Sequence, residues 1–449
     1  MSWLHPPPDW QEILNREGSR ITGYLGRGEV DPAPGGRYEH WDRLRHRNPP
    51  EGLDSESWWA LIRLQRQLAS RRLPMRDLKD RPFEYVRTPT LEAALHRIDS
   101  RTTGRIATPD VHVNPDQRDR YLISSLIEES VTSSQLEGAA TTRRVAVDML
   151  RSGRRPRDDG ERMIFNNFRA MEDIRRWQNE PLTPTRVLEL HARVTTDTLD
   201  EPANAGRLQQ PGEERIAVWD EHRNRVLYRP PPAEYLPQRL EAMCEFANQT
   251  WTDNNFIHPV IQAITLHFWL AWDHPFVDGN GRTARALFYW KMLNAGYWLF
   301  EFISISRVLK EKPGQYKRAF LETETDGNDL TYFILQQLGV IEEAVSELER
   351  YLERKNRELR EVEQYLHRGT ALNHRQLALL AHALRHPHAS YTTSSHQRSH
   401  GVAYATARAD LQELEQTGML VHRPGTRRPR EYLVPADLEA RIRNQPANR

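Results

Sequence analysis

The spacing of apolar residues along this chain is helical over most of its length. Between residues 116 and 366, apolar positions recur every three or four residues, and the run from His258 to Trp272 is unusually apolar. An earlier run from Ser55 to Ser70 repeats apolar residues at the same spacing, with arginines between them. The pattern therefore predicts a mainly α protein.

One short segment interrupts the helical spacing. Between Gly206 and Pro232, two β-prone runs at residues 216–218 and 226–228 flank a polar stretch, which predicts a β-hairpin. No neighbouring segment supplies a further strand to pair with it. We therefore expect a small hairpin with a free edge inside a helical domain.

The 449 residues exceed the usual size of one compact core, so we expect three domains. These are an N-terminal helical domain at 1–115, a central helical domain at 116–366 and a C-terminal domain at 370–440. The C-terminal domain resembles a winged helix, because its order is a helix at 375–384, a Ser/Thr-rich stretch, a helix at 403–416 and strands at 419–423 and 431–434.

A long helix predicted at 329–366 has one apolar face. Steps of three and four residues separate its members, which are Leu338, Ile341, Val345, Leu348 and Leu352. We favour a face that packs into the core of the same chain. A seam between two copies in a homodimer is the alternative.

Charge is balanced overall but not locally. The net charge of +1 gives the whole molecule no general attraction for nucleic acid. Residues 385–430, however, contain seven arginines against three acidic residues, a local net charge of +4. We expect Arg408 to face a DNA groove, and Arg427, Arg428 and Arg430 to touch phosphate. A winged helix used only for protein contacts is the alternative.

Composition also excludes several classes of protein. No stretch approaches the roughly 20 apolar residues that cross a bilayer, and the first residues lack the pattern of a secretory signal. We therefore expect a soluble cytoplasmic protein. Cys244 is the sole cysteine, which excludes intramolecular disulfides and multi-cysteine zinc sites. Its helical surroundings favour a small buried apolar role over catalysis.

Candidate chemistry is concentrated in the segment 274–285. A Gly-Asn-Gly turn at 279–281 precedes a predicted helix, where backbone N–H groups and the helix dipole favour an anion. Arg282 and Arg285 lie three residues apart on that helix. We therefore expect both guanidinium groups to face the same phosphates.

Two further side chains belong to this segment. Asp278, beside the turn, is the kind of hard carboxylate that Mg²⁺ uses next to phosphate oxygens. His274 has an unperturbed pKa near 6.5, so it is largely neutral at cellular pH and can accept a proton from a hydroxyl. Together these residues favour a functional site over a structural turn.

The segment resembles the complete signature of the Fic (filamentation induced by cAMP) family, in the order His274-x-Phe276-x-Asp278-Gly279-Asn280-Gly281-Arg282-x-x-Arg285. The resemblance implies a Fic-type helical core with a small hairpin, the flap. It also implies a protein adenylyltransferase, in which a Ser, Thr or Tyr hydroxyl of a target protein attacks the α-phosphate of ATP. AMP is then transferred and pyrophosphate leaves.

The resemblance also implies a role for each residue. The roles are general base for His274, Mg²⁺ ligand for Asp278, phosphate nest for Gly279, Asn280 and Gly281, phosphate clamps for Arg282 and Arg285, and loop anchor for Phe276. Tyr316 resembles a tyrosine that lines the adenine pocket, and a core tyrosine is the alternative. The hairpin at 216–228 corresponds to the flap, whose free edge receives the target segment by strand addition. The family often has Gly-x-x-Arg just before the flap, whereas this chain has Gln209 at the arginine position.

A second motif lies ahead of the first. The run Ser133-Ser-Gln-Leu-Glu137-Gly138 ends a predicted helix, with Gly138 as its stop. It resembles the inhibitory motif of the Fic subclass whose inhibitory helix is N-terminal to the catalytic motif. The resemblance implies that Glu137 pairs with Arg285, denies the ATP γ-phosphate its clamp and so inhibits the enzyme.

There are three alternative functions. A DNA-binding regulator whose Fic core only senses nucleotide would not need an intact His274. A Fic enzyme could instead transfer UMP or phosphocholine, or remove AMP with Glu137 positioning a water. A metal hydrolase built from His258, His267 and His274 is set aside, because spacings of nine and seven fit no zinc pattern.

Overall fold

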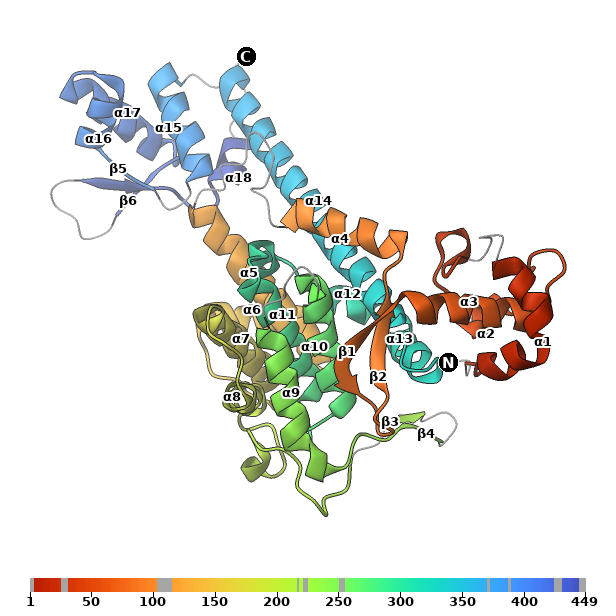
Figure 1. Ribbon diagram of the computed structural model, residues 1–449. Coiled ribbons are helices and arrows are strands. Elements are labelled where there is room, and N and C mark those ends of the chain that lie inside the picture. The colour runs from red at the N-terminus through yellow and green to blue at the C-terminus, as the bar shows by residue number, and fades with distance from the viewer. Residues whose placement is uncertain are drawn as a thin grey trace. The chain divides into compact units, whose positions relative to one another are not determined.

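The computed structural model describes residues 4–25, 31–102, 115–215, 218–220, 225–249, 255–369, 372–386, 389–423 and 430–443. The chain divides into two compact units, unit one with residues 1–106 and 125–345, and unit two with residues 107–124 and 346–449. Helices dominate both, and the described sheets have two or three strands (Figure 1). The mainly α class is confirmed, whereas the domain boundaries at 115 and 366 stay predictions.

Unit one consists of helices and two separate hairpins. Its helices are α1 (Trp10–Leu25), α2 (Trp41–Leu44), α3 (Ser55–Ala69), α4 (Pro89–Thr102), α5 (Pro115–Leu136), α6 (Arg143–Ser152), α7 (Asp159–Trp177), α8 (Pro184–Thr195), α9 (Leu236–Asn248), α10 (Pro259–Asp273), α11 (Asn280–Asn294), α12 (Ile305–Glu311), α13 (Pro313–Thr325) and α14 (Thr331–Gly369). Its strands are β1 (Ser70–Arg76), β2 (Pro82–Val86), β3 (Val218–Asp220) and β4 (Arg225–Tyr228). Both α5 and α14 also contribute residues to unit two.

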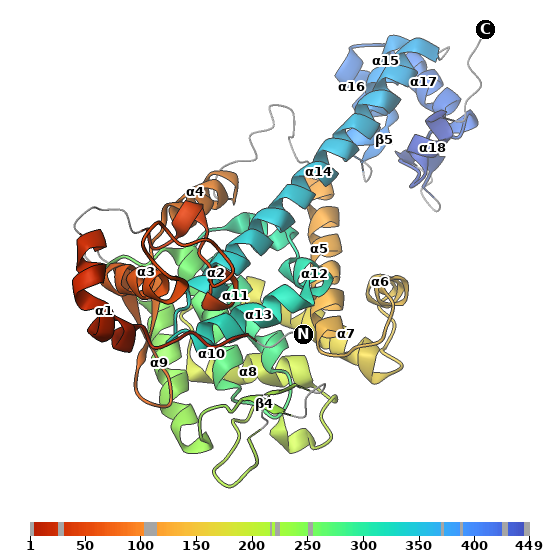
Figure 2. The same ribbon diagram turned by 90° about the vertical axis from the view of Figure 1, so that its right-hand side faces the viewer.

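Helices α10 and α11 lie in the middle of unit one (Figures 1 and 2). The first packs on α9 and α11, and the second packs on α7 and α8. Almost every side chain of α10 is buried, and a helix that is apolar all round is stable only among other helices. The α10 helix begins at Pro259, and the His258 ring accepts a hydrogen bond from the Val260 N–H at 3.3 Å. The turn between these two central helices holds residues 274–279.

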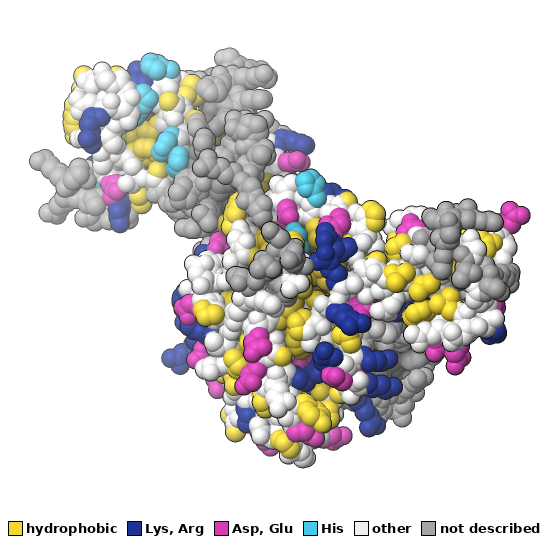
Figure 3. Space-filling view, in the orientation of Figure 1, with side chains coloured by type: hydrophobic (Ala, Val, Ile, Leu, Met, Phe, Trp, Pro, Cys, Tyr) yellow, Lys and Arg dark blue, Asp and Glu magenta, His cyan; other side chains and the backbone are white. Residues whose placement is uncertain are grey.

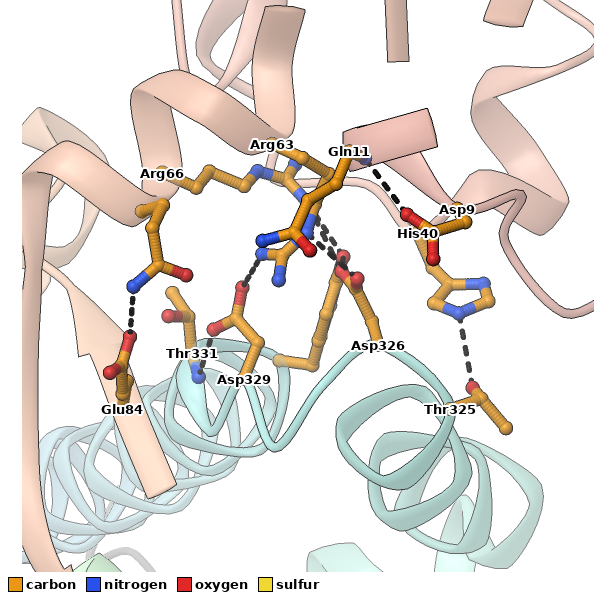
Figure 4. Close-up of polar contacts among 12 residues, drawn as sticks. Asp9, Gln11, His40, Arg63, Arg66, Glu84, Thr325, Asp326, Asp329 and Thr331 are labelled. Carbon is orange, nitrogen blue, oxygen red and sulfur yellow. Dashed lines mark hydrogen bonds and ion pairs between the residues drawn. The ribbon is translucent and has the colours of Figure 1, made fainter. Parts of the chain in front are cut away.

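A buried ionic cluster fixes the N-terminal helices to the rest of unit one (Figure 4). Arg63 of α3 lies 3.0 Å from Asp326 and 3.4 Å from Asp329, in the turn between α13 and α14. Arg66, also on α3, donates to the Tyr332 hydroxyl at 2.7 Å. All five side chains are buried, so removing one charge would leave its partner unpaired in a dry environment.

The predicted hairpin is present. Strands β3 and β4 pair in antiparallel fashion, with Val218 opposite Tyr228 and Asp220 opposite Arg225. They form a two-stranded sheet of their own within the described part of the chain. Both strands lie close to the predicted positions, although residues 216 and 217 are outside the described ranges.

Unit two contains α15 (His374–Arg385), β5 (Ser390–Thr392), α16 (Thr393–His400), α17 (Tyr404–Gln416), β6 (Val421–His422), β7 (Glu431–Leu433) and α18 (Leu438–Arg443). The strand order in its sheet is β5-β7-β6. The Ser/Thr-rich stretch forms β5 and α16, because Thr392 and Ser395 make a reciprocal capping box at the start of that helix. The element order is typical of a winged helix.

Three residues of the predicted apolar face on α14, Leu338, Ile341 and Val345, are buried within unit one. This agrees with a core-packing role for that part of the helix, and the homodimer stays a prediction. None of the helices in the described ranges has both the length and the apolar character to span a bilayer.

The described surface is mixed in character. The face shown in Figure 3 carries both basic and acidic side chains, with apolar ones between them, which is in keeping with the small net charge. Cys244 is buried in α9, and this burial raises the pKa of its thiol to about 12. A thiol that stays protonated is a poor nucleophile, so the structure agrees with a packing role for this residue.

Candidate active site

His274 follows the last residue of α10 in a left-handed backbone conformation, with φ 45° and ψ 53°. Its N–H still donates to the Leu270 carbonyl at 3.0 Å, as in the helix before it. A residue with a β-carbon costs roughly 1 to 2 kcal/mol in this conformation, so the surrounding contacts must hold it there. The chain leaves α10 at this residue and enters the turn toward α11.

The side chain of Asn280 braces that turn. Its Oδ1 accepts from the Phe276 N–H at 3.0 Å, and its Nδ2 donates to the Phe276 carbonyl at 2.8 Å. Phe276 is fully buried and stacks on the ring of His191, with ring centroids 3.7 Å apart. The loop is therefore anchored at Phe276, and the Asn280 side chain is used for this anchoring.

Gly279 fits a place that no larger residue could occupy. Its φ is +80°, and a β-carbon there would come within 2.6 Å of Thr195 Cγ2 on α8. The Gly279 N–H donates to the Asp278 carboxylate at 2.6 Å. Glycine therefore permits both the left-handed turn and the close approach of α8.

The start of α11 is occupied by the carboxylate of Glu137. A β-carbon added at Gly281 would lie 2.1 Å from Glu137 Oε1, so this oxygen rests directly against the first turn of the helix. The N-terminus of a helix carries unpaired N–H groups and the positive end of its dipole, which attract anions. The anion site predicted at the Gly-Asn-Gly turn thus faces an acidic side chain from the end of α5.

Arg285 completes the contact with α5. Its Nε donates to Ser133 Oγ at 2.9 Å, and its Nη2 donates to the Ser133 carbonyl at 2.9 Å and to Glu137 Oε1 at 3.0 Å. Burial is the largest influence and disfavours the charged form of Arg285, but Glu137, Tyr316 and Glu129 together outweigh it, and the pKa of Arg285 is raised. This side chain is 2% exposed and remains a cation.

Arg282 points elsewhere. Its Nη1 donates to the Val194 carbonyl of α8 at 2.8 Å, and its Nη2 lies 3.1 Å from Asp278 Oδ2. Its Nε is buried and has no hydrogen-bond partner among the described residues. The two arginines expected to face the same phosphates therefore have different partners here, and Glu137 pairs with Arg285.

The imidazole of His274 is held neutral. Burial lowers its pKa below the ordinary value, and the charge of Arg215 lowers it further. A hydrogen bond to the Ala271 carbonyl and the charges of Glu137 and Asp278 oppose this without reversing it. A neutral imidazole with one nitrogen bound to a carbonyl has its other nitrogen available to accept a proton.

Asp278 is the candidate metal ligand. Its side chain is 51% exposed and pairs with Arg282 at 3.1 Å. No group of three or more acidic, His or Cys side chains within the described residues could hold a metal by itself. Mg²⁺ usually binds through one or two carboxylates together with substrate phosphates, so a lone carboxylate beside an anion site fits this ion.

Tyr316 of α13 lies in an aromatic cluster. Its hydroxyl is 2.8 Å from Nε2 of His267, and its ring contacts those of Phe320 and Phe333. Burial raises the pKa of Tyr316 to about 12 and lowers the pKa of His267 to about 3. His258 instead bonds to Asp99 at 2.9 Å, so the histidines weighed for a metal hydrolase have separate partners.

His191 of α8 also belongs to the site, although no sequence motif marks it. Its Nε2 donates to the Asp278 carbonyl at 2.9 Å, and its Nδ1 accepts from the Gly206 N–H at 3.0 Å. Burial lowers its pKa to about 4. The available signal was a polar residue on the apolar face that also contains Leu190 and Val194.

Glu129 of α5 is not marked by a sequence motif either. Its buried carboxylate accepts from the hydroxyls of Tyr289 at 2.9 Å and Ser304 at 2.8 Å, and from the N–H of Ser306 at 3.1 Å. These bonds hold α5 against α11 and the start of α12. The segment 133–138 at the end of α5 is therefore positioned by a buried polar network.

The site lies in a segment that is similar to known proteins. Residues 181–292 match the model of the Fic/DOC family. The chain is 31% identical over 120 residues to the "Protein adenylyltransferase Fic" of Nematostella vectensis, covering 27% of this chain and 25% of that protein. It is 48% identical over 120 residues to the protein of the same name from Drosophila grimshawi, covering 27% and 22%. The chain thus spans about a quarter of the length of these curated relatives.

A solved structure supports the fold. The crystal structure of a Fic family protein from Desulfovibrio desulfuricans G20 matches with a TM-score of 0.51 and 18% identity, covering 78% of this chain and 98% of that one. At this identity the likeness concerns the fold alone.

Proposed function

We propose that the protein is an adenylyltransferase that moves AMP from ATP to a Ser, Thr or Tyr hydroxyl of a protein. The observation that carries this proposal is a neutral His274 just before the start of α11. The Gly-Asn-Gly turn forms the start of this helix, and Arg285 lies in its second turn. The relatives that match the Fic/DOC segment bear the name protein adenylyltransferase.

The reaction begins with proton transfer to His274 from the target hydroxyl. The hydroxyl oxygen forms a bond to the α-phosphorus of ATP, and the bond from that phosphorus to the bridging oxygen breaks. Pyrophosphate leaves with the electron pair. Asp278 would hold Mg²⁺, which neutralises phosphate charge when bound.

Backbone N–H groups at the start of α11 are the proposed site for the ATP phosphates, with Gly279 and Gly281 allowing close approach. Arg285 is the proposed clamp for the phosphates. Tyr316 is a candidate contact for the adenine through the cluster beside Arg285. The free edge of the β3–β4 hairpin is the proposed place for the target segment, which would add as a strand.

Glu137 is the proposed inhibitory residue. Its carboxylate lies against Gly281 and 3.0 Å from Arg285, where a phosphate would otherwise bind. A hydrogen bond to a charged group contributes about 1.5 to 3 kcal/mol, which corresponds to about tenfold or more in ATP binding. The enzyme is therefore expected to be slow until this ion pair opens.

The test is incubation with Mg²⁺ and ATP labelled at the α-phosphate, using wild type, Glu137→Gly and His274→Ala proteins. We expect label on the Glu137→Gly protein or on lysate proteins, a mass increase of one AMP, and neither with His274→Ala. No label, with folded proteins that still bind ATP, would overturn the proposal. Labelled UTP and an AMP-modified protein would then test transfer of UMP and removal of AMP.

A second candidate function concerns unit two. The first turns of α17 expose Tyr404 and Arg408, while Asp410 of the same helix is buried and lies 2.7 Å from Arg375. Glu415, further along, bonds to Arg430 at 2.8 Å. The exposed start of α17 therefore has a cation and an aromatic ring, which fits the major groove of DNA.

Two of the arginines predicted for this surface, Arg427 and Arg428, lie outside the described residues, and Arg430 is paired. Anisotropy of a labelled DNA duplex at several salt concentrations tests the proposal. Arg408→Ala should weaken binding and reduce the salt slope by about one, whereas Arg169→Ala in unit one should not. Equal binding by both variants would contradict it.

A further inference from the structure

The backbone on both sides of His274 is held by one short segment of the chain. The Gln209 N–H donates to the carbonyl of Pro275 at 2.9 Å, and Arg215 Nη2 donates to the carbonyl of Asp273 at 2.6 Å. Asp273 immediately precedes His274, and Pro275 immediately follows it. Gln209 is 3% exposed, so its contact is made inside the protein.

The side chains of these two residues also bind each other, and Arg215 binds the segment that follows the flap. Arg215 Nη1 donates to Gln209 Oε1, and Arg215 Nε donates to the Pro231 carbonyl at 2.8 Å, three residues after β4 ends. Gln209 Nε2 donates to the Glu214 carbonyl at 3.1 Å. One guanidinium group thus connects the flap, Gln209 and the end of α10.

Other contacts at the end of α10 fix only the last turn of this helix. The Asp273 carboxylate binds Arg239 at 2.6 Å and Trp269 at 3.0 Å, and these bonds secure the last turn of the helix. They involve neither the Pro275 carbonyl nor the flap. The left-handed backbone conformation of His274 is unfavourable, so it persists only when contacts fix the backbone before and after this residue.

We propose that Gln209 and Arg215 form a positioning pair that holds the catalytic base in its left-handed conformation and couples it to the flap. This inference rests on the proposed transferase function. A target segment that docks on the flap would act on His274 through the Pro231 and Asp273 carbonyls.

Besides burial, the charge of Arg215 lowers the pKa of His274, which a purely structural role of Arg215 would not do. The pKa of His274 therefore distinguishes the two roles. Burial is the main reason for the lowered pKa of His274, and Arg215 lowers it further, against Glu137, Asp278 and the Ala271 carbonyl. Removing the cation should therefore raise the pKa of His274. Replacing it by lysine keeps the charge but cannot bind three acceptors in the same plane.

The experiment compares Arg215→Ala, Arg215→Lys and Gln209→Ala in the Glu137→Gly background, by transfer of labelled AMP onto the protein itself. We expect kcat to fall about 10- to 100-fold, with the KM for ATP within about twofold, because a small displacement of the base costs rate and not phosphate binding. The acid limb of the rate profile should move to higher pH for Arg215→Ala and stay in place for Arg215→Lys and Gln209→Ala.

Arg207→Ala is the matched control, because Arg207 lies in the same segment but pairs at 2.9 Å with Glu213. It should leave kcat and the pH profile unchanged. A fall in kcat of the same size for Arg207→Ala, or a rise in the KM for ATP that accounts for the whole loss, would overturn the proposal.

Two measurements keep this inference separate from the transferase proposal. If the Glu137→Gly protein transfers nothing, NMR titration of His274 and hydrogen exchange of residues 225–228 still test the pair. Arg215→Ala should raise the His274 pKa and speed that exchange at least tenfold, and Arg207→Ala should do neither. Unchanged exchange and an unchanged His274 titration in Arg215→Ala would overturn the positioning pair, whatever the enzyme's activity.

Discussion

The carboxylate of Glu137 lies 3.0 Å from the guanidinium of Arg285, although 148 residues separate them in the sequence. The same carboxylate oxygen rests against Gly281, at the start of α11. One acidic side chain therefore engages both features that would bind the phosphates of ATP, the arginine and the helix N-terminus. This arrangement supports the proposed inhibition by direct competition with phosphate.

Glu137→Gly should raise AMP transfer about tenfold or more, because it frees Arg285 and the helix start together. Initial rates with ATP labelled at the α-phosphate provide the measurement. Glu128→Gln is the control, since Glu128 is also on α5 but pairs with Arg143. Equal rates for wild type and Glu137→Gly would refute the inhibitory role.

Gly281→Ala should be coupled energetically to Glu137. The added β-carbon would lie 2.1 Å from Glu137 Oε1 and must push it away from Arg285. We expect a coupling of about 0.5 to 3 kcal/mol when urea unfolding of Gly281→Ala is compared in the wild-type and Glu137→Gly backgrounds. Gly339→Ala, within α14 and facing open space, should change the stability by the same amount in both backgrounds. Additive effects for Gly281→Ala would show that the carboxylate does not occupy this position in solution.

Gly279→Ala should destabilise unit one strongly. The left-handed backbone costs roughly 1 to 2 kcal/mol for alanine, and the clash with Thr195 about 1 to 3 kcal/mol more. Gly212→Ala is the matched control, because Gly212 has a φ of +91° but open space around it. The free energy of unfolding should therefore fall further for Gly279→Ala. Equal losses would mean that α8 does not approach the turn closely.

His40 should make the stability of unit one depend on pH. Burial lowers its pKa from 6.5 to about 3, with Arg318 and other cations adding to this against Asp42. Between pH 6.5 and about 3, His40 therefore binds a proton in the unfolded chain but not in the folded chain. Stability due to this residue is present above pH 6.5 and falls by about 1.4 kcal/mol per pH unit as the pH drops toward 3.

Urea unfolding at pH 7.0 and 5.5 provides the test for His40. The loss of stability between these values should be smaller in His40→Gln by about 1 to 1.5 kcal/mol. His46→Gln serves as the control, because His46 lies in the same region near the end of α2. The same pH dependence in His40→Gln and wild type would show that His40 is accessible to protons in the folded state.

Several features could be predicted from the sequence because they are local. The apolar spacing of α10 and the short β-prone runs of the hairpin predicted the right element types, since each depends on neighbours a few residues apart. The chemistry-bearing residues from His274 to Arg285 lie in one twelve-residue segment, so their proximity needs no tertiary information. The order of the other elements in unit two was predictable for the same reason, although the sequence pattern did not indicate the α16 helix.

Other features were decided only when distant segments packed together. Arg282 and Arg285 share a helix, but the Val194 carbonyl of α8 draws the first away and the end of α5 binds the second. Gln209 marked a departure from the family pattern, and the sequence could not say that Arg215 would bind the carbonyl beside His274. Local spacing determined which residues the site contains. Burial and long-range hydrogen bonds, which depend on how the helices pack, determined what each of them contacts.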